Sequence, residues 1–138
     1  MSGTYEGRPL VNWAAYTQAR AELGANFVRI LGYFREDGIK SVDAIETAMR
    51  GGIAAGLVIP AHTLKGESTQ FGAEMLGEIA ETIETIARGC IENHDAPDEA
   101  LEHVVALRPL FLETLTLLER EANPLAVRRP AQFGRRSA

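Results

Sequence analysis

Apolar side chains recur at steps of three and four residues along most of this 138-residue chain. One such series is Leu23, Phe27, Ile30, Leu31 and Phe34. This spacing places the apolar side chains on one face of an α-helix, which must then be buried against another element. No segment alternates between apolar and polar residues over a useful length, so nothing in the sequence indicates a β-sheet. The sequence therefore predicts an all-α protein.

Glycine, proline and polar residues interrupt this pattern and divide it into helical segments. We expect helices over about residues 11–16, 23–35, 41–50, 53–69, 73–88 and 97–121. Gly38 is expected to follow the end of one helix, and Ser41 is a suitable N-cap for the next. The segments predict one domain over residues 11–122, an antiparallel four-helix bundle with short additional N-terminal helical segments. Residues 1–10 are expected to form a flexible N-terminus and residues 123–138 a basic, disordered tail.

The last predicted helix carries more apolar residues than one bundle face needs. Its expected inward stripe consists of Leu101, Val104, Val105, Phe111, Leu112, Leu115 and Leu118. A second stripe, on another side of the helix, consists of Leu107, Leu110 and Leu117. The second stripe either packs against the N-terminal segment or is exposed for self-association.

His62 lies in the predicted helix over residues 53–69, on the side away from the apolar face. At about 100° per residue, the apolar face is formed by Ile53, Leu57, Ala61, Leu64, Ser68 and Phe71. Lys65, Gly66 and Thr69 fall on the same side as His62, one or two turns further on. A nucleophile, a cation and a stretch of backbone without a side chain therefore share one surface.

The turn before His62 has two further features. Pro60 lacks a backbone N–H and its ring presses on the preceding turn, so it is expected to bend the helix near Gly56. Val58 and Ile59 place apolar side chains on the histidine's own face. They either form a docking patch for a protein partner or are covered by neighbouring helices.

The run His62-Thr63-Leu64-Lys65-Gly66, followed by Phe71-Gly72-Ala73, resembles the signature of the histidine-containing phosphotransfer (HPt) domain of multistep two-component phosphorelays. The number and spacing of the helices extend a weaker match over residues 11–122. Glu67 departs from the family pattern, which usually has Ser or Ala at that position, and its carboxylate could alter partner choice. Glu84 corresponds to a Gln that some members place near the histidine ring, and its carboxylate could accept a hydrogen bond from the imidazole.

The resemblance implies that His62 is phosphorylated. Its imidazole would accept a phosphoryl group from an aspartyl phosphate on a response-regulator receiver domain, or on one attached to a hybrid histidine kinase, and pass it to another receiver. Lys65 would stabilise the charge on the phosphoryl oxygens, and Gly66 would let the partner approach the helix backbone. Thr69 or Glu84 would orient the ring. The divalent metal that such transfers require would be bound by the receiver, so we expect no metal or cofactor on this chain.

Several other functions are disfavoured. The sequence has neither a Gly-x-x-x-x-Gly-Lys-Ser/Thr loop nor a Gly-x-Gly-x-x-Gly loop, so we expect a phosphocarrier rather than an enzyme that uses ATP. The net charge of −5 disfavours nucleic-acid binding. Because there is no long apolar run, no signal-peptide pattern and only one cysteine, Cys90, we expect a cytoplasmic protein that does not enter a membrane. His94, His103 and the acids near them lack the spacing of a metal site.

Two other functions fit the same residues. One is a non-catalytic helical adaptor that dimerises through the second stripe and in which His62 has no role. The other is the dimerisation and phosphotransfer part of a histidine kinase, which also needs an ATP-binding domain. For the phosphocarrier we expect a monomer, with a homodimer as the alternative.

Overall fold

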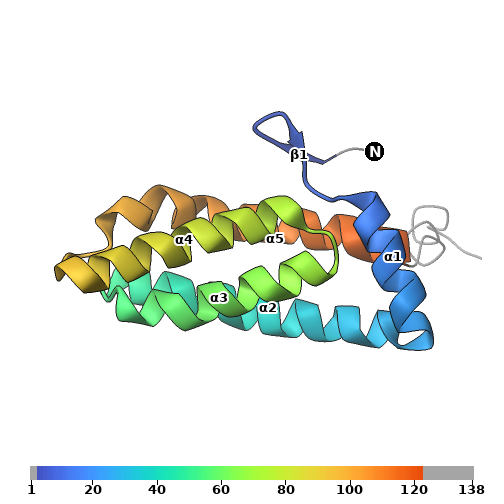
Figure 1. Cartoon of the computed structure of the whole chain (residues 1–138), viewed down its shortest axis with the longest axis horizontal. Helices are drawn as coiled ribbons and strands as arrows, with labels where there is room; N and C mark the ends of the chain where they lie inside the picture. Colours follow the sequence, from blue (N-terminus) through green and yellow to red (C-terminus); the bar gives the residue numbers. More distant parts are fainter. Residues whose placement is uncertain (1–2, 123–138) are drawn as a thin grey trace, which may run out of the picture.

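Four long helices run antiparallel and form a bundle (Figure 1). The structure, a computed structural model, describes residues 3–122. The bundle helices are α2 (Phe27–Arg50), α3 (Ala55–Gln70), α4 (Glu74–Asn93) and α5 (Leu101–Ala122). Helix α3 packs against α2 and α4, and α5 packs against the same two helices from the other side. The predicted all-α, antiparallel four-helix bundle is confirmed.

The shorter helices lie at the ends of the bundle. Helix α1 (Trp13–Leu23) crosses one end, followed by the 3₁₀ turn η1 (Gly24–Asn26), and η2 (Asp98–Ala100) precedes α5. The expected helix over 11–16 is therefore too short, because Asn12 caps a helix that continues to Leu23. The Asn12 side chain accepts a hydrogen bond from the Ala15 N–H at 3.1 Å. None of the helices that the structure describes is long and apolar enough to cross a membrane.

Helix α2 is continuous, so the predicted break at Gly38 and the predicted N-cap at Ser41 are wrong. Gly38 is buried inside the helix, where a Cβ would lie 2.6 Å from Cζ of Phe111. The missing side chain lets the Phe111 ring of α5 pack directly on the α2 backbone. Tertiary packing therefore accounts for this glycine, which costs the helix about 1 kcal/mol relative to alanine.

Helix α4 also continues further than expected, through Gly89 to Asn93. It ends at His94, which adopts a left-handed conformation with φ of 59° and donates its N–H to the carbonyls of Cys90 and Ile91. A left-handed residue after the last turn is a common way to end a helix. Helix α3, in contrast, begins later than predicted. Ile53 precedes the helix and is exposed instead of joining the buried stripe.

The N-terminal segment forms a β-hairpin, which the sequence analysis missed. Strand β1 (Thr4–Tyr5) pairs antiparallel with β2 (Arg8–Pro9). Glu6 and Gly7 between them both have positive φ, at 53° and 79°, as a tight hairpin turn requires. Two residues per strand are too few for an alternating pattern to be visible. Leu10, which follows the hairpin, is fully buried and joins the core.

The apolar residues of α5 divide differently from the prediction. The buried ones are Val104, Leu107, Leu110, Phe111, Leu115, Leu117 and Leu118. Leu101, Val105 and Leu112 were placed in the inward stripe, but all three are exposed. The second stripe is buried, and a Cβ on Gly3 would lie 2.6 Å from Cδ1 of Leu117, so this end of the stripe packs against the N-terminal segment. The surface that the adaptor alternative requires for self-association is therefore covered.

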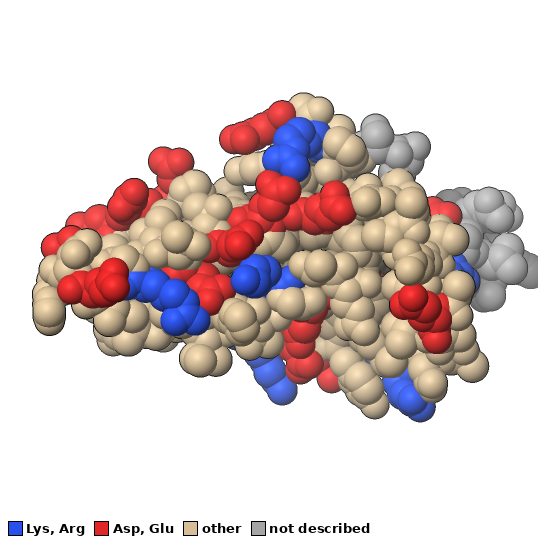
Figure 2. Space-filling model, in the orientation of Figure 1, with Lys and Arg blue, Asp and Glu red and all other residues tan. Residues whose placement is uncertain are grey.

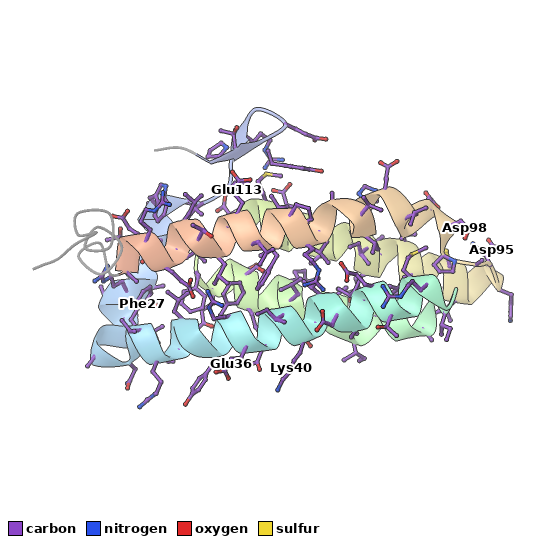
Figure 3. All side chains as sticks on the ribbon, turned by 180° about the vertical axis from the view of Figure 1, so that it is seen from behind. Phe27, Glu36, Lys40, Asp95, Asp98 and Glu113 are labelled. Carbon is purple, nitrogen blue, oxygen red and sulfur yellow. The ribbon has the colours of Figure 1, made fainter. Side chains whose placement is uncertain are left out.

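A chain of aromatic rings joins the helices in the core. Tyr16, Phe27, Phe71, Phe34 and Phe111 follow one another with ring centroids 5.3, 5.6, 5.4 and 5.8 Å apart. The Tyr16 hydroxyl donates to the carbonyl of Leu118 at 3.0 Å, which holds α1 against the end of α5. Figure 3 shows the opposite side of the molecule, where Phe27 lies by the core and Glu36 and Lys40 lie on the outer side of α2.

Substitutions at two glycines of α2 test this packing. Gly38→Ala should lower the free energy of unfolding by about 1–3 kcal/mol, because the added methyl would overlap the buried Phe111 ring. Gly32→Ala is the matched control: no described atom lies within 4 Å of the position of its Cβ. It should raise the free energy of unfolding by up to about 1 kcal/mol. Denaturant unfolding measures both, and equal effects would show that Gly38 is not a packing position.

Candidate functional site

His62 lies near the middle of α3 with 60% of its side chain exposed, as predicted. Its Nδ1 is 3.2 and 3.1 Å from the two carboxylate oxygens of Glu84, on the neighbouring helix α4. An ionised carboxylate only accepts hydrogen bonds, so Nδ1 carries the ring proton and donates it to Glu84. In the neutral ring, Nε2 is then the nitrogen with the free lone pair.

Glu84 is buried, with 8% of its side chain exposed. Arg88 donates to its Oε2 from Nε at 3.0 Å and from Nη2 at 2.8 Å. Burial by itself raises the pKa of Glu84, but the hydrogen bonds from Arg88 and His62 and the charge of Lys65 outweigh it. The pKa of Glu84 therefore lies below its ordinary value, and the group is an anion at neutral pH.

Lys65 and Gly66 lie one turn after His62, on its side of α3. The Lys65 Nζ is 3.7 Å from Oε1 of Glu84, a longer separation than that of Arg88 from the same carboxylate. No described atom of another helix lies within 4 Å of the position that a Cβ of Gly66 would occupy, so the backbone is open here. The Thr69 hydroxyl donates to the Lys65 carbonyl at 2.9 Å and is not paired with the ring.

The two apolar residues before His62 have different environments. Val58 is buried, which agrees with the alternative that neighbouring helices cover it. It therefore does not form part of an exposed patch. Ile59 is 72% exposed and remains available to a partner. Helix α3 continues without interruption from Ala55 through Pro60 to Gln70. Gly56, whose carbonyl cannot bond to Pro60, lies in the first turn of the helix.

An open groove between α3 and α4 continues from the histidine. It is lined by Lys65, Gly66, Thr69, Glu74, Gly77, Glu78 and Glu81. The helices approach closely here, because a Cβ on Gly77 would lie 3.4 Å from Oγ1 of Thr69. Figure 2 shows that acidic side chains gather over α4 on this face. Within residues 3–122, no three His, Cys, Asp or Glu side chains are placed to hold a metal ion.

Glu67 lies on the α2 side of α3 and interacts with Asp37 of α2. Burial, together with the negative charge of nearby Asp37, raises the pKa of Glu67 above its ordinary value. From the sequence this carboxylate was expected to border the site, but it is partly buried and the charged group near it is Asp37 of α2. Arg88 was not predicted from the sequence, although its position four residues after Glu84 is the spacing of a helical ion pair.

A family model described as the Hpt domain matches residues 29–122, so the chain belongs to the Hpt domain family. Members of this family are phosphocarriers that act in histidine phosphotransfer, together with receiver domains and histidine kinases of phosphorelays. The fold is similar to the crystal structure of histidine-containing phosphotransfer protein B (HptB) from Pseudomonas aeruginosa PAO1, with a TM-score of 0.72 and 20% sequence identity. That match covers 82% of this chain and 94% of the other. A comparison with curated proteins finds no match.

The pair of Glu67 and Asp37 predicts a pH-dependent effect on stability. Because folding raises the pKa of Glu67, ionisation of this group opposes folding, and stability is lost as the pH rises from its unfolded to its folded pKa. Glu67→Gln should therefore raise the melting temperature at pH 7, and the gain should disappear below about pH 4. Thermal unfolding at the two pH values measures this. Glu81→Gln, at an exposed position on α4, controls for the loss of one negative charge, and the same pH-dependent gain there would contradict the assignment to Glu67.

Proposed function

We propose that Nε2 of His62 is the atom that carries the phosphoryl group in this protein. The donor is an aspartyl phosphate on a receiver domain, including one attached to a hybrid histidine kinase, and the acceptor is an aspartate on another receiver. The observation that carries the proposal is the pairing of Nδ1 with Glu84 on an otherwise exposed ring. This pairing fixes one tautomer and leaves the other nitrogen free for attack.

The transfer balances without any other reactant. The lone pair of Nε2 forms a bond to phosphorus as the bond from phosphorus to the aspartyl oxygen breaks, and that electron pair returns to the receiver carboxylate. The ring then has a proton on Nδ1 and a phosphoryl group on Nε2, and the Glu84 carboxylate compensates its positive charge. In the onward transfer a carboxylate oxygen of the acceptor aspartate forms a bond to phosphorus as the bond from phosphorus to Nε2 breaks, and that electron pair returns to Nε2. The leaving group is a neutral imidazole, so no proton has to move.

The neighbours of His62 support the two requirements of phosphoryl transfer, which are in-line approach and charge stabilisation. Lys65 supplies a positive charge one turn away from the ring. Gly66 leaves the backbone open to the partner, and Ile59 offers an exposed apolar contact beside the ring. Glu84 orients the ring, whereas the proposed role of Thr69 is limited to the partner surface.

The proposal describes a carrier rather than an enzyme with its own ATP site. The divalent metal belongs to the receiver, whose acidic residues bind it next to the phosphorylated aspartate. We further propose that the protein acts in the cytoplasm. We also propose that it is a monomer, since the second apolar stripe of α5 is buried inside the domain.

Radiolabel transfer from a phosphorylated receiver tests the proposal directly. The wild-type protein should acquire a label that is labile in acid and stable in base, and His62→Gln should acquire none. Lys65→Ala should be labelled about tenfold more slowly, which corresponds to a loss of about 1.4 kcal/mol in the transition state. An unlabelled wild-type protein, or equal labelling of His62→Gln, would rule out His62 as the carrier.

The clearance at Gly66 can be tested with a matched pair of variants. Gly66→Leu should remain folded, because the site of its side chain is open, yet it should slow transfer at least about tenfold by keeping the receiver from the helix backbone. Gly32→Leu introduces the same side chain at an open position on α2 and should transfer at the wild-type rate. Labelling kinetics with a common receiver compare the two. Equal rates in both variants would show that the partner does not approach α3 at this glycine.

A further inference from the structure

Arg88 is the residue of this region that the proposed transfer does not use. It lies on α4, one turn after Glu84, with 59% of its side chain exposed. Two of its nitrogens donate to the same oxygen of Glu84, at 3.0 and 2.8 Å. The other interactions of that carboxylate are with His62 and Lys65. Arg88 is thus connected to the histidine through a single buried side chain.

We propose that Arg88 is a positioning residue that controls the tautomer of His62 through Glu84. The inference rests on the proposed function, because it concerns the same histidine. Arg88 does not touch the reacting atoms. It holds the carboxylate ionised and directed at Nδ1, so that Nε2 remains the reactive nitrogen.

The electrostatics of the buried carboxylate carry this inference. An unpaired buried anion is costly. Without Arg88, the Glu84 carboxylate would therefore take up a proton or turn towards the remaining cation, Lys65. The guanidinium of Arg88 makes two hydrogen bonds in a fixed plane, which neutralises the carboxylate and limits its rotation. A neutral amide at this position would need no such partner. The requirement for Arg88 therefore follows from the carboxylate of Glu84.

The distances also indicate that the two cations have different roles. Arg88 approaches the carboxylate to 2.8 Å, whereas Lys65 Nζ stays at 3.7 Å. Because Arg88 holds Glu84 more closely than Lys65 does, the flexible Lys65 side chain can turn to the phosphoryl oxygens while the buried carboxylate keeps a cationic partner. Without Arg88, Lys65 would have to pair with both the Glu84 carboxylate and the phosphoryl group. The loss of Arg88 should then affect both the orientation of the ring and the rate of transfer.

A double-mutant cycle distinguishes action through Glu84 from direct contact with the phosphoryl group or the receiver. The proteins are the wild type, Arg88→Met, Glu84→Gln and the double variant. Arg35→Met is the matched control, because Arg35 is 51% exposed and makes two hydrogen bonds to Glu119 between α2 and α5. Circular dichroism confirms that each variant is folded.

The first measurement is the ¹⁵N chemical shifts of the His62 ring, which report the tautomer without any partner. The wild type and Arg35→Met should show the proton on Nδ1, and Arg88→Met should show a mixture of tautomers. The double variant should match Glu84→Gln. A wild-type tautomer in Arg88→Met would overturn the proposal.

The second measurement is the rate of phosphoryl transfer from one receiver. Arg88→Met should be about tenfold slower than the wild type, whereas Arg88→Met in the Glu84→Gln background should have little further effect. The same slowing in both backgrounds would overturn the proposal in favour of direct contact with the phosphoryl group or the receiver. If the wild type takes no label, the proposed function fails, and the ring tautomers still decide whether Arg88 acts through Glu84.

Discussion

The packing of Phe71 at the end of α3 fixes the geometry on which the site depends. Its ring contacts Phe27 and Phe34 of α2, and the carbonyl of the next residue, Gly72, accepts a hydrogen bond from the Asn12 N–H at 2.8 Å. Gly72 has a φ of 76°, and a Cβ there would lie 2.6 Å from the Asn12 carbonyl oxygen, so the turn tolerates no side chain. The turn sets the register of α4 against α3. That register brings Glu84 next to His62, 22 residues away in the chain.

A buried carboxylate beside His62, the proposed phosphorylation site, changes the electrostatics of the site. A neutral amide would orient the ring without adding charge, whereas Glu84 places an anion next to the proposed site of phosphorylation. The anion is tolerable because Arg88 and Lys65 both lie within 4 Å of it. In the proposed transfer, the carboxylate in return stabilises the cationic ring that carries the phosphoryl group. The four side chains therefore act as one compensated network instead of as separate residues.

The errors of the sequence analysis have a common physical cause. Gly38, Ser41 and Gly89 are residues that favour helix ends, and each lies inside a helix. Local propensities amount to about 1 kcal/mol or less per residue, which is less than the burial of a single large apolar side chain. Contacts from other helices, such as Phe111 on Gly38, therefore decide where a helix continues.

The sequence by itself determined the helical class, the bundle, the exposed position of His62 and the open backbone at Gly66, because these depend on the spacing of residues within one helix. Only the tertiary structure decided that Glu84 is buried, that it contacts His62 and that Arg88 compensates it. These properties depend on how α3 and α4 are aligned, and the periodicity of each helix contains no information about that alignment. The N-terminal hairpin is also decided by the tertiary structure. Its strands are too short to be recognised from the sequence, and contacts with α4 and α5 stabilise this segment.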